Sequence, residues 1–199
     1  MSKVLEFKKT ESEYSLSIRA ESTTHAVMEL YGTVGGDWFG EGIVAKDVIN
    51  QLKELPASIK TLDLHINSPG GSVVEGLAIY NRLKEYGKKV KITAHVDALS
   101  ASIASIVMMA ANEIHMGEAG FVMIHKPWVM ASGNSDDLEK TISILDDIEN
   151  QMLNIYSKKT KMSRIEIKDL LAKETWMDAD MALEYGFIDK KKEDTDSKR

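Results

Sequence analysis

The same pattern occurs twice in succession in this chain: a strand, a tight turn and a helix. In the first unit, residues 61–67 alternate apolar with polar side chains, and residues 73–86 carry apolar side chains at helical spacing. In the second unit we expect a strand over residues 90–96, a turn over 97–100 and a helix over 101–111. Such units in succession predict an α/β fold with largely parallel strands, in which ligands bind where strands lead into helices.

The rest of the chain extends this pattern. Further strands are expected over residues 26–31, 113–116 and 121–125. Further helices are expected over residues 43–55, 136–158, 164–172 and 180–185. We therefore divide the chain into an N-terminal arm (1–24), one α/β domain (25–189) and a charged, flexible tail (190–199) that has nothing to bury.

Composition excludes several classes of function. The net charge of −6 disfavours nucleic acid as a partner, because binding phosphates needs a surplus of Lys and Arg. The chain contains no cysteine, which excludes disulfides, thiolate metal sites and a cysteine nucleophile, and favours a reducing compartment. Its first residues are too polar for a signal peptide, and no apolar run is long enough to cross a membrane. We expect a cytoplasmic protein that needs no metal or organic cofactor and makes no membrane contact.

Two turns at the carboxyl ends of the expected strands carry most of the chemistry. In the first turn, Gly70 and Gly71 would let backbone N–H groups approach a reacting carbonyl, although Pro-Gly-Gly is also ordinary turn chemistry. A phosphate cradle is disfavoured, because the lysine and the glycine spacing of a P-loop are missing.

The second turn presents three serines. Ser100 suits the helix N-cap, whereas Ser105 lies one turn into the helix and could face the core or bond back to a carbonyl. Ser102 lies in the first turn, where free N–H groups and the helix dipole favour negative charge, and the N–H of Ile103 could face a developing oxyanion. These local arguments favour Ser102 as a nucleophile.

A base for that serine could be His125, 23 positions beyond Ser102. His125 ends an apolar strand directly before Lys126 and Pro127, which would leave its ring at the strand terminus. Position alone leaves a structural role open, as it does for His65 and His95, which alternation places on one face of the sheet.

Four segments in this order resemble the proteolytic subunit of the Clp protease family: residues 66–71 (INSPGG), 101–105 (ASIAS), 123–128 (MIHKPW) and 182–189 (ALEYGFID). The resemblance runs from about residue 32 to residue 189. Residues 40–42 (GEG) and 75–81 (EGLAIYN) are most similar to the ClpP-like head maturation proteases of bacteriophages and prophages. The resemblance implies a ClpP/crotonase-like fold and makes residues 25–189 a ClpP-like serine peptidase domain.

The resemblance also implies a role for each residue of the site. Ser102 would be the nucleophile and His125 the general base, while the N–H groups of Gly71 and Ile103 would form the oxyanion hole. The reaction would be endopeptidase cleavage of proteins or peptides through an acyl-enzyme.

The third member of the triad departs from the family pattern. That pattern has an aspartate two positions before an aromatic residue; here the aromatic is Trp176 and the matching residue is Glu174, with Asp178 as the alternative. A glutamate can orient an imidazole as an aspartate does. A second departure is Ala98, which stands where the family has a glycine before the nucleophile.

The helix over residues 136–158 has two interpretations. It could pack within the domain, or it could be the handle helix that interlocks facing rings in this family, with residues 129–133 engaging the substrate or the opposite ring. The resemblance implies a homo-oligomeric ring, a heptamer or stacked rings. A partner could be an AAA+ unfoldase or phage capsid proteins, and ATP would belong to that partner because the chain has no P-loop.

Two other functions remain open at this point. A crotonase-type acyl-CoA enzyme would share the fold and the glycine turn without needing both Ser102 and His125. A catalytically inactive ClpP-like scaffold subunit would account for the atypical Glu174.

Overall fold

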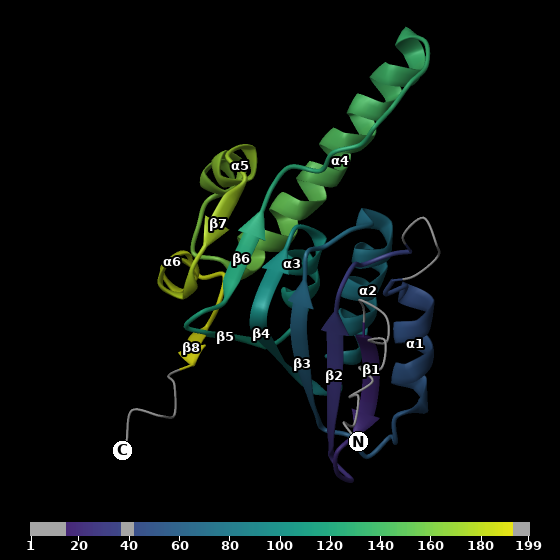
Figure 1. The fold of residues 1–199 in the computed structure, drawn as a ribbon, viewed down its shortest axis with the longest axis vertical. Coiled ribbons are helices and arrows are strands. Elements are labelled where there is room, and N and C mark those ends of the chain that lie inside the picture. Colours follow the sequence, from purple (N-terminus) through teal and green to yellow (C-terminus); the bar gives the residue numbers. More distant parts are fainter. Residues whose placement is uncertain (1–14, 37–41, 193–199) are drawn as a thin grey trace, which may run out of the picture.

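The computed structural model describes residues 15–36 and 42–192 (Figure 1). These residues form eight strands: β1 (Ser15–Ala20), β2 (His25–Tyr31), β3 (Thr61–Ser68), β4 (Lys91–Ala101), β5 (Glu113–Gly117), β6 (Phe121–Ile124), β7 (Thr175–Met177) and β8 (Lys190–Lys192). They also form six helices: α1 (Ala45–Glu54), α2 (Val73–Tyr86), α3 (Ile103–Met108), α4 (Ser135–Lys159), α5 (Arg164–Ala172) and α6 (Ala179–Tyr185).

All eight strands belong to one sheet, in the order β1-β2-β3-β4-β5-β8, while β6 pairs with β4 and β7 pairs with β6. The pairs β1–β2 and β6–β7 are antiparallel, and the other pairs are parallel. The predicted α/β class with largely parallel strands is confirmed.

The core lies on one face of the sheet, where alternate side chains are removed from water. On β3, Leu62, Leu64 and Ile66 are fully buried, as their alternation with polar residues predicts. Ile79 of α2 and Ile103 of α3 join the same core. The packing of these helices requires Gly76, because a Cβ there would lie 2.2 Å from the side chain of Ile103.

The predicted turn over residues 97–100 is wrong, because β4 continues to Ala101. The register against β3 runs from Ile66 opposite Val96 to Ser68 opposite Ser100, so residues 97–99 of β4 stand opposite one residue of β3. This irregularity is a β-bulge, which bends a strand and increases its twist. The bend lets the two halves of β4 pair with different neighbours: the first with β5 and the last three residues with β6.

The helix that follows β4 is also shorter than the predicted range of 101–111. It spans Ile103–Met108, and the next three residues form turns in which Met109, Ala110 and Ala111 donate backbone hydrogen bonds to residues three positions earlier. The change of direction between strand and helix is therefore confined to the single residue Ser102.

Two strands, one at each end of the chain, lie outside residues 25–189. Residues 15–20, expected in the arm, form β1, which pairs with β2 along its whole length and packs Leu16 and Ile18 against the core. Residues 190–192, expected in the tail, form β8 on the edge of β5. Asp189 fixes this pairing, because its backbone N–H donates to Ile114 and its carboxylate accepts from the Ile114 N–H. Residues 1–14 of the expected arm and 193–199 of the expected tail lie outside the described residues.

Helix α4 spans one residue more at each end than the predicted range and begins with a capping box formed by Asn134 and Asp137. Its buried positions start only at Glu149, beyond the middle of the helix. Figure 1 shows the N-terminal half of α4 projecting past the rest of the molecule. The helix therefore both packs within the domain and presents a long projecting segment.

Candidate active site

Ser102 and His125 meet at the end of the sheet. The Oγ of Ser102 lies 2.7 Å from Nε2 of His125. The pairing of β4 with β6 brings them together, because Ala101 lies in register with Met123 and the Ser102 N–H donates to the Met123 carbonyl at 2.8 Å. Residues 23 positions apart in the sequence thus become neighbours.

The backbone at Ser102 is held in a conformation that L-residues rarely adopt, with φ 52° and ψ −127°. Such a conformation costs on the order of 1–3 kcal/mol and persists only where surrounding contacts enforce it. Ser102 occupies the N-cap position of α3, yet its side chain makes no capping hydrogen bond. Its hydroxyl is therefore directed to His125 instead.

The assignment of Ser100 as the N-cap is wrong. Ser100 lies within β4 and is fully buried, and its hydroxyl has no hydrogen-bond partner among the described residues. The bulge in β4 carries the chain two residues further before the helix starts, which is why the cap position falls on Ser102. Ser105, by contrast, bonds back to the Ser102 carbonyl, one of the two roles expected for it.

The glycine turn lies directly against the serine. Gly70 and Gly71 have φ of 93° and 139°, which favour glycine. A Cβ at Gly70 would lie 2.7 Å from the Cβ of Ser102, and one at Gly71 would lie 2.1 Å from the Val34 carbonyl oxygen. Two backbone hydrogen bonds hold the turn to Val34: the Val34 N–H donates to the Gly70 carbonyl, and the Ser72 N–H donates to the Val34 carbonyl. The N–H of Gly71 has no backbone partner among residues 15–36 and 42–192.

A pocket of about 440 Å³ opens beside the Ser102–His125 pair. It is lined by Thr33, Pro69, Gly70, Gly71, Val73, Ser102, Met123, His125, Pro127 and Trp128. Both glycines of the turn face this space, so a carbonyl bound there could meet the Ser102 hydroxyl and free backbone N–H groups together.

Glu174 and His125 both lie just outside the paired strands β6 and β7, and no hydrogen bond joins their side chains. Ile124 and Thr175 are the last pair of the antiparallel ladder between β6 and β7, so His125 and Glu174 are the first residues beyond it. Glu174 has a left-handed backbone with φ 49° and an exposed side chain. No hydrogen bond links its carboxylate to His125.

Asp178, the alternative third member, has a different contact. It is the N-cap residue of α6, and its Oδ1 accepts a hydrogen bond from the Met181 N–H at 2.9 Å. Capping of the helix is a sufficient reason for an aspartate at this position, so Asp178 needs no catalytic role to explain it.

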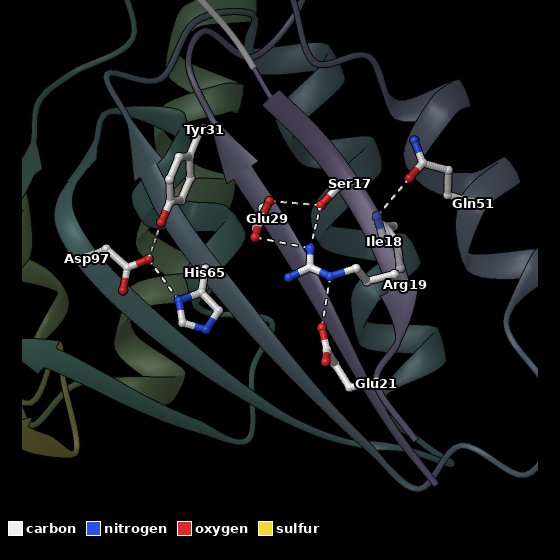
Figure 2. A network of polar contacts seen from close by, with 9 residues as sticks. All are labelled: Ser17, Ile18, Arg19, Glu21, Glu29, Tyr31, Gln51, His65 and Asp97. Carbon is white, nitrogen blue, oxygen red and sulfur yellow. Dashed lines mark hydrogen bonds and ion pairs between the residues drawn. The ribbon is translucent and has the colours of Figure 1, made fainter. Parts of the chain in front are cut away.

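A polar network that sequence reasoning missed lies at the bulge of β4. Oδ2 of Asp97 accepts a hydrogen bond from the Tyr31 hydroxyl at 2.6 Å and lies 2.8 Å from Nδ1 of His65 (Figure 2). Burial acts to raise the pKa of Asp97, but the hydrogen bonds from His65 and Tyr31 outweigh it and lower that pKa. The predicted common face of His65 and His95 was the available signal, and the two rings stack at 4.8 Å.

No group of three or more His, Asp or Glu side chains suited to holding a metal ion occurs in the described parts of the chain. Within the same residues, no helix is both long and apolar enough to cross a membrane.

Fold and site together define an α/β protein in which a hydroxyl and an imidazole meet at the carboxyl end of a strand, beside a glycine turn. This pair is suited to nucleophilic acyl transfer, since the imidazole can take the hydroxyl proton. The sequence profile of the Clp protease family matches residues 39–194. The chain therefore belongs to the Clp protease family, the ClpP-like peptidases.

Three curated relatives illustrate the similarity. The ATP-dependent Clp protease proteolytic subunit 1 of Protochlamydia amoebophila (strain UWE25) is 30% identical over 177 residues, covering 86% of this chain and 84% of the relative. Subunit 2 of Tropheryma whipplei (strain Twist) is 26% identical over 159 residues, covering 76% and 87%. Subunit 1 of Chlamydia muridarum (strain MoPn / Nigg) is 27% identical over 161 residues, covering 76% and 83%.

Proposed function

We propose that this chain is a serine endopeptidase with Ser102 as its nucleophile. The observation that carries the proposal is the 2.7 Å contact between the Ser102 hydroxyl and Nε2 of His125. A serine hydroxyl is a weak nucleophile near neutral pH and needs a base within hydrogen-bond reach. The strained backbone of Ser102 supports the same role, since such strain clusters at functional sites.

In the proposed reaction, Ser102 Oγ attacks the carbonyl carbon of the peptide bond while His125 Nε2 takes the hydroxyl proton. The N–H groups of Gly71 and Ile103 hold the oxyanion that forms. His125 then gives its proton to the leaving amine, which departs and leaves an acyl-enzyme. Water, activated by His125, hydrolyses that ester and restores the Ser102 hydroxyl.

For the third member we favour Glu174 over Asp178. The antiparallel register supports Glu174, because it immediately precedes Thr175, the residue of β7 that pairs with Ile124. Hydrogen bonds of a catalytic site are often loose without substrate and tighten in the complex. Among the described residues no hydrogen bond holds the exposed Glu174 carboxylate elsewhere, whereas Asp178 would have to give up its contact with Met181.

We propose that the active form is a homo-oligomeric ring, a heptamer or stacked rings, with α4 at the contact between rings. Exposed apolar side chains on the projecting half of α4 and on the segment before it support this proposal, since contiguous exposed apolar surface marks interaction sites. They are Trp128, Val129, Met130, Leu138, Ile142 and Ile144.

Two partners are proposed for such a ring, which would act on proteins or peptides. The names of the relatives describe proteolytic subunits of an ATP-dependent protease, which supports an AAA+ unfoldase. A head-maturation role on phage capsid proteins rests on the resemblance of residues 40–42 and 75–81. The lack of cysteine supports a cytoplasmic setting in either case.

The two rival functions are not favoured. A crotonase-type enzyme would give no reason for the Ser102–His125 contact, and an inactive scaffold would not need a strained serine at that position.

Hydrolysis of casein or of a capsid protein tests the proposal. Purified protein should cleave the substrate, and Ser102→Ala should abolish cleavage. Ser100→Ala is the matched control, because Ser100 lies two residues earlier and its hydroxyl has no hydrogen-bond partner among the described residues; this variant should keep its activity. Cleavage that survives Ser102→Ala would refute the proposal.

A further inference from the structure

Helix α4 contacts a neighbour of each member of the Ser102–His125 pair through two polar side chains on its buried face. These are Glu149 and Tyr156, seven positions apart, which places them on the same side of the helix. Both are buried, and neither lines the pocket beside Ser102. They are therefore poorly placed to touch a substrate, and well placed to hold the residues that do.

Tyr156 is connected to Ser102 through the hydroxyl of Ser105. The Oγ of Ser105 donates to the Ser102 carbonyl at 2.5 Å and lies 2.7 Å from the Tyr156 hydroxyl. A carbonyl can only accept, so the single hydroxyl proton of Ser105 is used on Ser102. Tyr156 must then donate to Ser105. The chain of two hydrogen bonds fixes the peptide group of the residue whose backbone is strained.

Glu149 is connected to His125 through Lys126, the next residue in the chain. The Oε2 of Glu149 lies 3.2 Å from Nζ of Lys126, the residue after His125, and its Oε1 lies 3.6 Å from Nζ of Lys168 on α5. The Glu149 side chain is only 10% exposed, so its charge depends on these two partners. The Lys126 N–H also donates to the Leu171 carbonyl. Lys126 is thus held on both its backbone and its side chain.

We infer that Glu149 and Tyr156 are positioning residues that keep Ser102 and His125 at reacting distance, an inference that rests on the proposed function. The pair needs such support for two reasons. The Ser102 conformation is unfavourable by itself. His125 lies beyond the end of β6, and no carboxylate of the described residues is hydrogen-bonded to its Nδ1. The single helix α4 supplies both supports.

The rate of covalent labelling by a fluorophosphonate tests this inference. Varying the reagent concentration gives a limiting labelling rate and a half-saturating concentration. Tyr156→Phe and Glu149→Gln should each lower the limiting rate about tenfold, the change that corresponds to one lost hydrogen bond. The half-saturating concentration should not change, because neither residue lines the pocket.

Matched control variants remove the same chemical group at a different position in the protein. Tyr86→Phe removes a tyrosine hydroxyl at the end of α2 opposite the glycine turn, and Glu139→Gln neutralises a glutamate on the exposed half of α4. Both should label at the wild-type rate. Ser105→Ala interrupts the same chain as Tyr156→Phe, so it should slow labelling equally, and the double variant should be no slower than either single variant. Lys126→Arg keeps the charge opposite Glu149 and should retain most of the rate.

Folding is followed on the same samples by thermal unfolding. If Tyr156→Phe fails to fold, Ser105→Ala carries the test, because it removes only the bridging hydroxyl. Folded variants that label within about twofold of wild type would overturn the inference. So would rates that fall only in proportion to the unfolded fraction, or a change confined to the half-saturating concentration. Wild-type protein that shows no Ser102-dependent labelling would instead refute the proposed function.

Discussion

Ser102 donates its backbone N–H to the carbonyl of Met123 at 2.8 Å, across the junction of β4 and β6. This one bond fixes the serine relative to the strand that delivers His125 two residues later. The geometry of the site therefore depends on the pairing of β4 with β6, and that pairing depends on the bulge that bends β4.

Removing the imidazole should nearly abolish the reaction without unfolding the protein. His125→Ala is expected to lower kcat/KM by at least about 10³-fold, because the hydroxyl loses its base. Steady-state cleavage of a fluorogenic peptide measures this loss, and circular dichroism checks the fold. Activity within about tenfold of wild type would show that His125 is not the base.

Placing a side chain at Gly71 should displace the turn. A Cβ there would lie 2.1 Å from the Val34 carbonyl oxygen, and φ of 139° is unfavourable for alanine. Gly71→Ala should destabilise the protein by about 1–3 kcal/mol and reduce cleavage severely. Gly117→Ala is the matched control, since a Cβ at Gly117 meets nothing within 4 Å. Equal unfolding free energies for the two variants would contradict the steric argument.

Substitutions of Glu174 and of Asp178 should have different effects on activity and stability. Glu174→Gln should lower kcat by about 10²–10⁴-fold with little effect on stability, as expected for a carboxylate that orients the imidazole. Asp178→Asn should keep most of the activity and lower stability by at most about 1 kcal/mol, because asparagine also caps helices. Peptide cleavage and urea unfolding separate the two effects. The reverse pattern would transfer the role to Asp178.

The stability conferred by His65 and Asp97 should depend on pH. The hydrogen bond to Asp97 raises the pKa of His65, although burial opposes this, and the pKa of Asp97 is lowered. The His65 contribution is therefore fully present below its unfolded pKa of about 6.5 and is lost as pH rises through the raised folded value. The Asp97 contribution is present above its unfolded pKa of about 3.9 and is lost as pH falls through the lowered folded value.

The pair should thus stabilise the fold most between about pH 4 and about pH 6.5. Chemical unfolding of wild type and His65→Gln over a pH series measures this as a difference in the free energy of unfolding. That difference should shrink as pH rises above the raised pKa of His65. A difference that stays constant from about pH 5 to about pH 9 would contradict the account.

The projecting half of α4 should be needed for assembly. Ile142 is 58% exposed, so Ile142→Glu would place a charge in the proposed contact between rings. Sedimentation velocity should show smaller particles for this variant. Ser143→Glu adds the same charge at the next residue of the helix but removes no apolar side chain, so it should form larger particles than Ile142→Glu. A wild-type protein that sediments as a monomer at micromolar concentration would rule out the ring.

Local signals were sufficient to predict some elements from the sequence. The helix α2 was predicted with its observed bounds, because Ser72 caps its start and Gly87 ends it. The bulge of β4 could not be foreseen, since it appears only in the register of β4 against β3, a strand separated from it in the sequence by a whole helix. Strand β8 was missed for a similar reason: its three lysines carry no strand pattern, and they pair only because Asp189 delivers them to β5.

In the candidate site, too, local sequence signals predict some features, while others depend on tertiary contacts. Ser102 and Gly71 could be selected from turn chemistry and from resemblance. The support of that site by Glu149 and Tyr156 could not, because it depends on which face of α4 meets the domain. The sequence predicts Asp97 only as part of a turn, whereas its carboxylate is hydrogen-bonded to both His65 and Tyr31.

Mapping the site of covalent modification tests the central claim most directly. The protein is treated with a fluorophosphonate, digested and analysed by tandem mass spectrometry, with His125→Ala in parallel. We predict a single phosphonylated residue, Ser102, whose labelling is lost or strongly slowed in His125→Ala. An adduct on Ser100 or Ser105, or no adduct on folded protein, would contradict the assignment of Ser102 as the nucleophile.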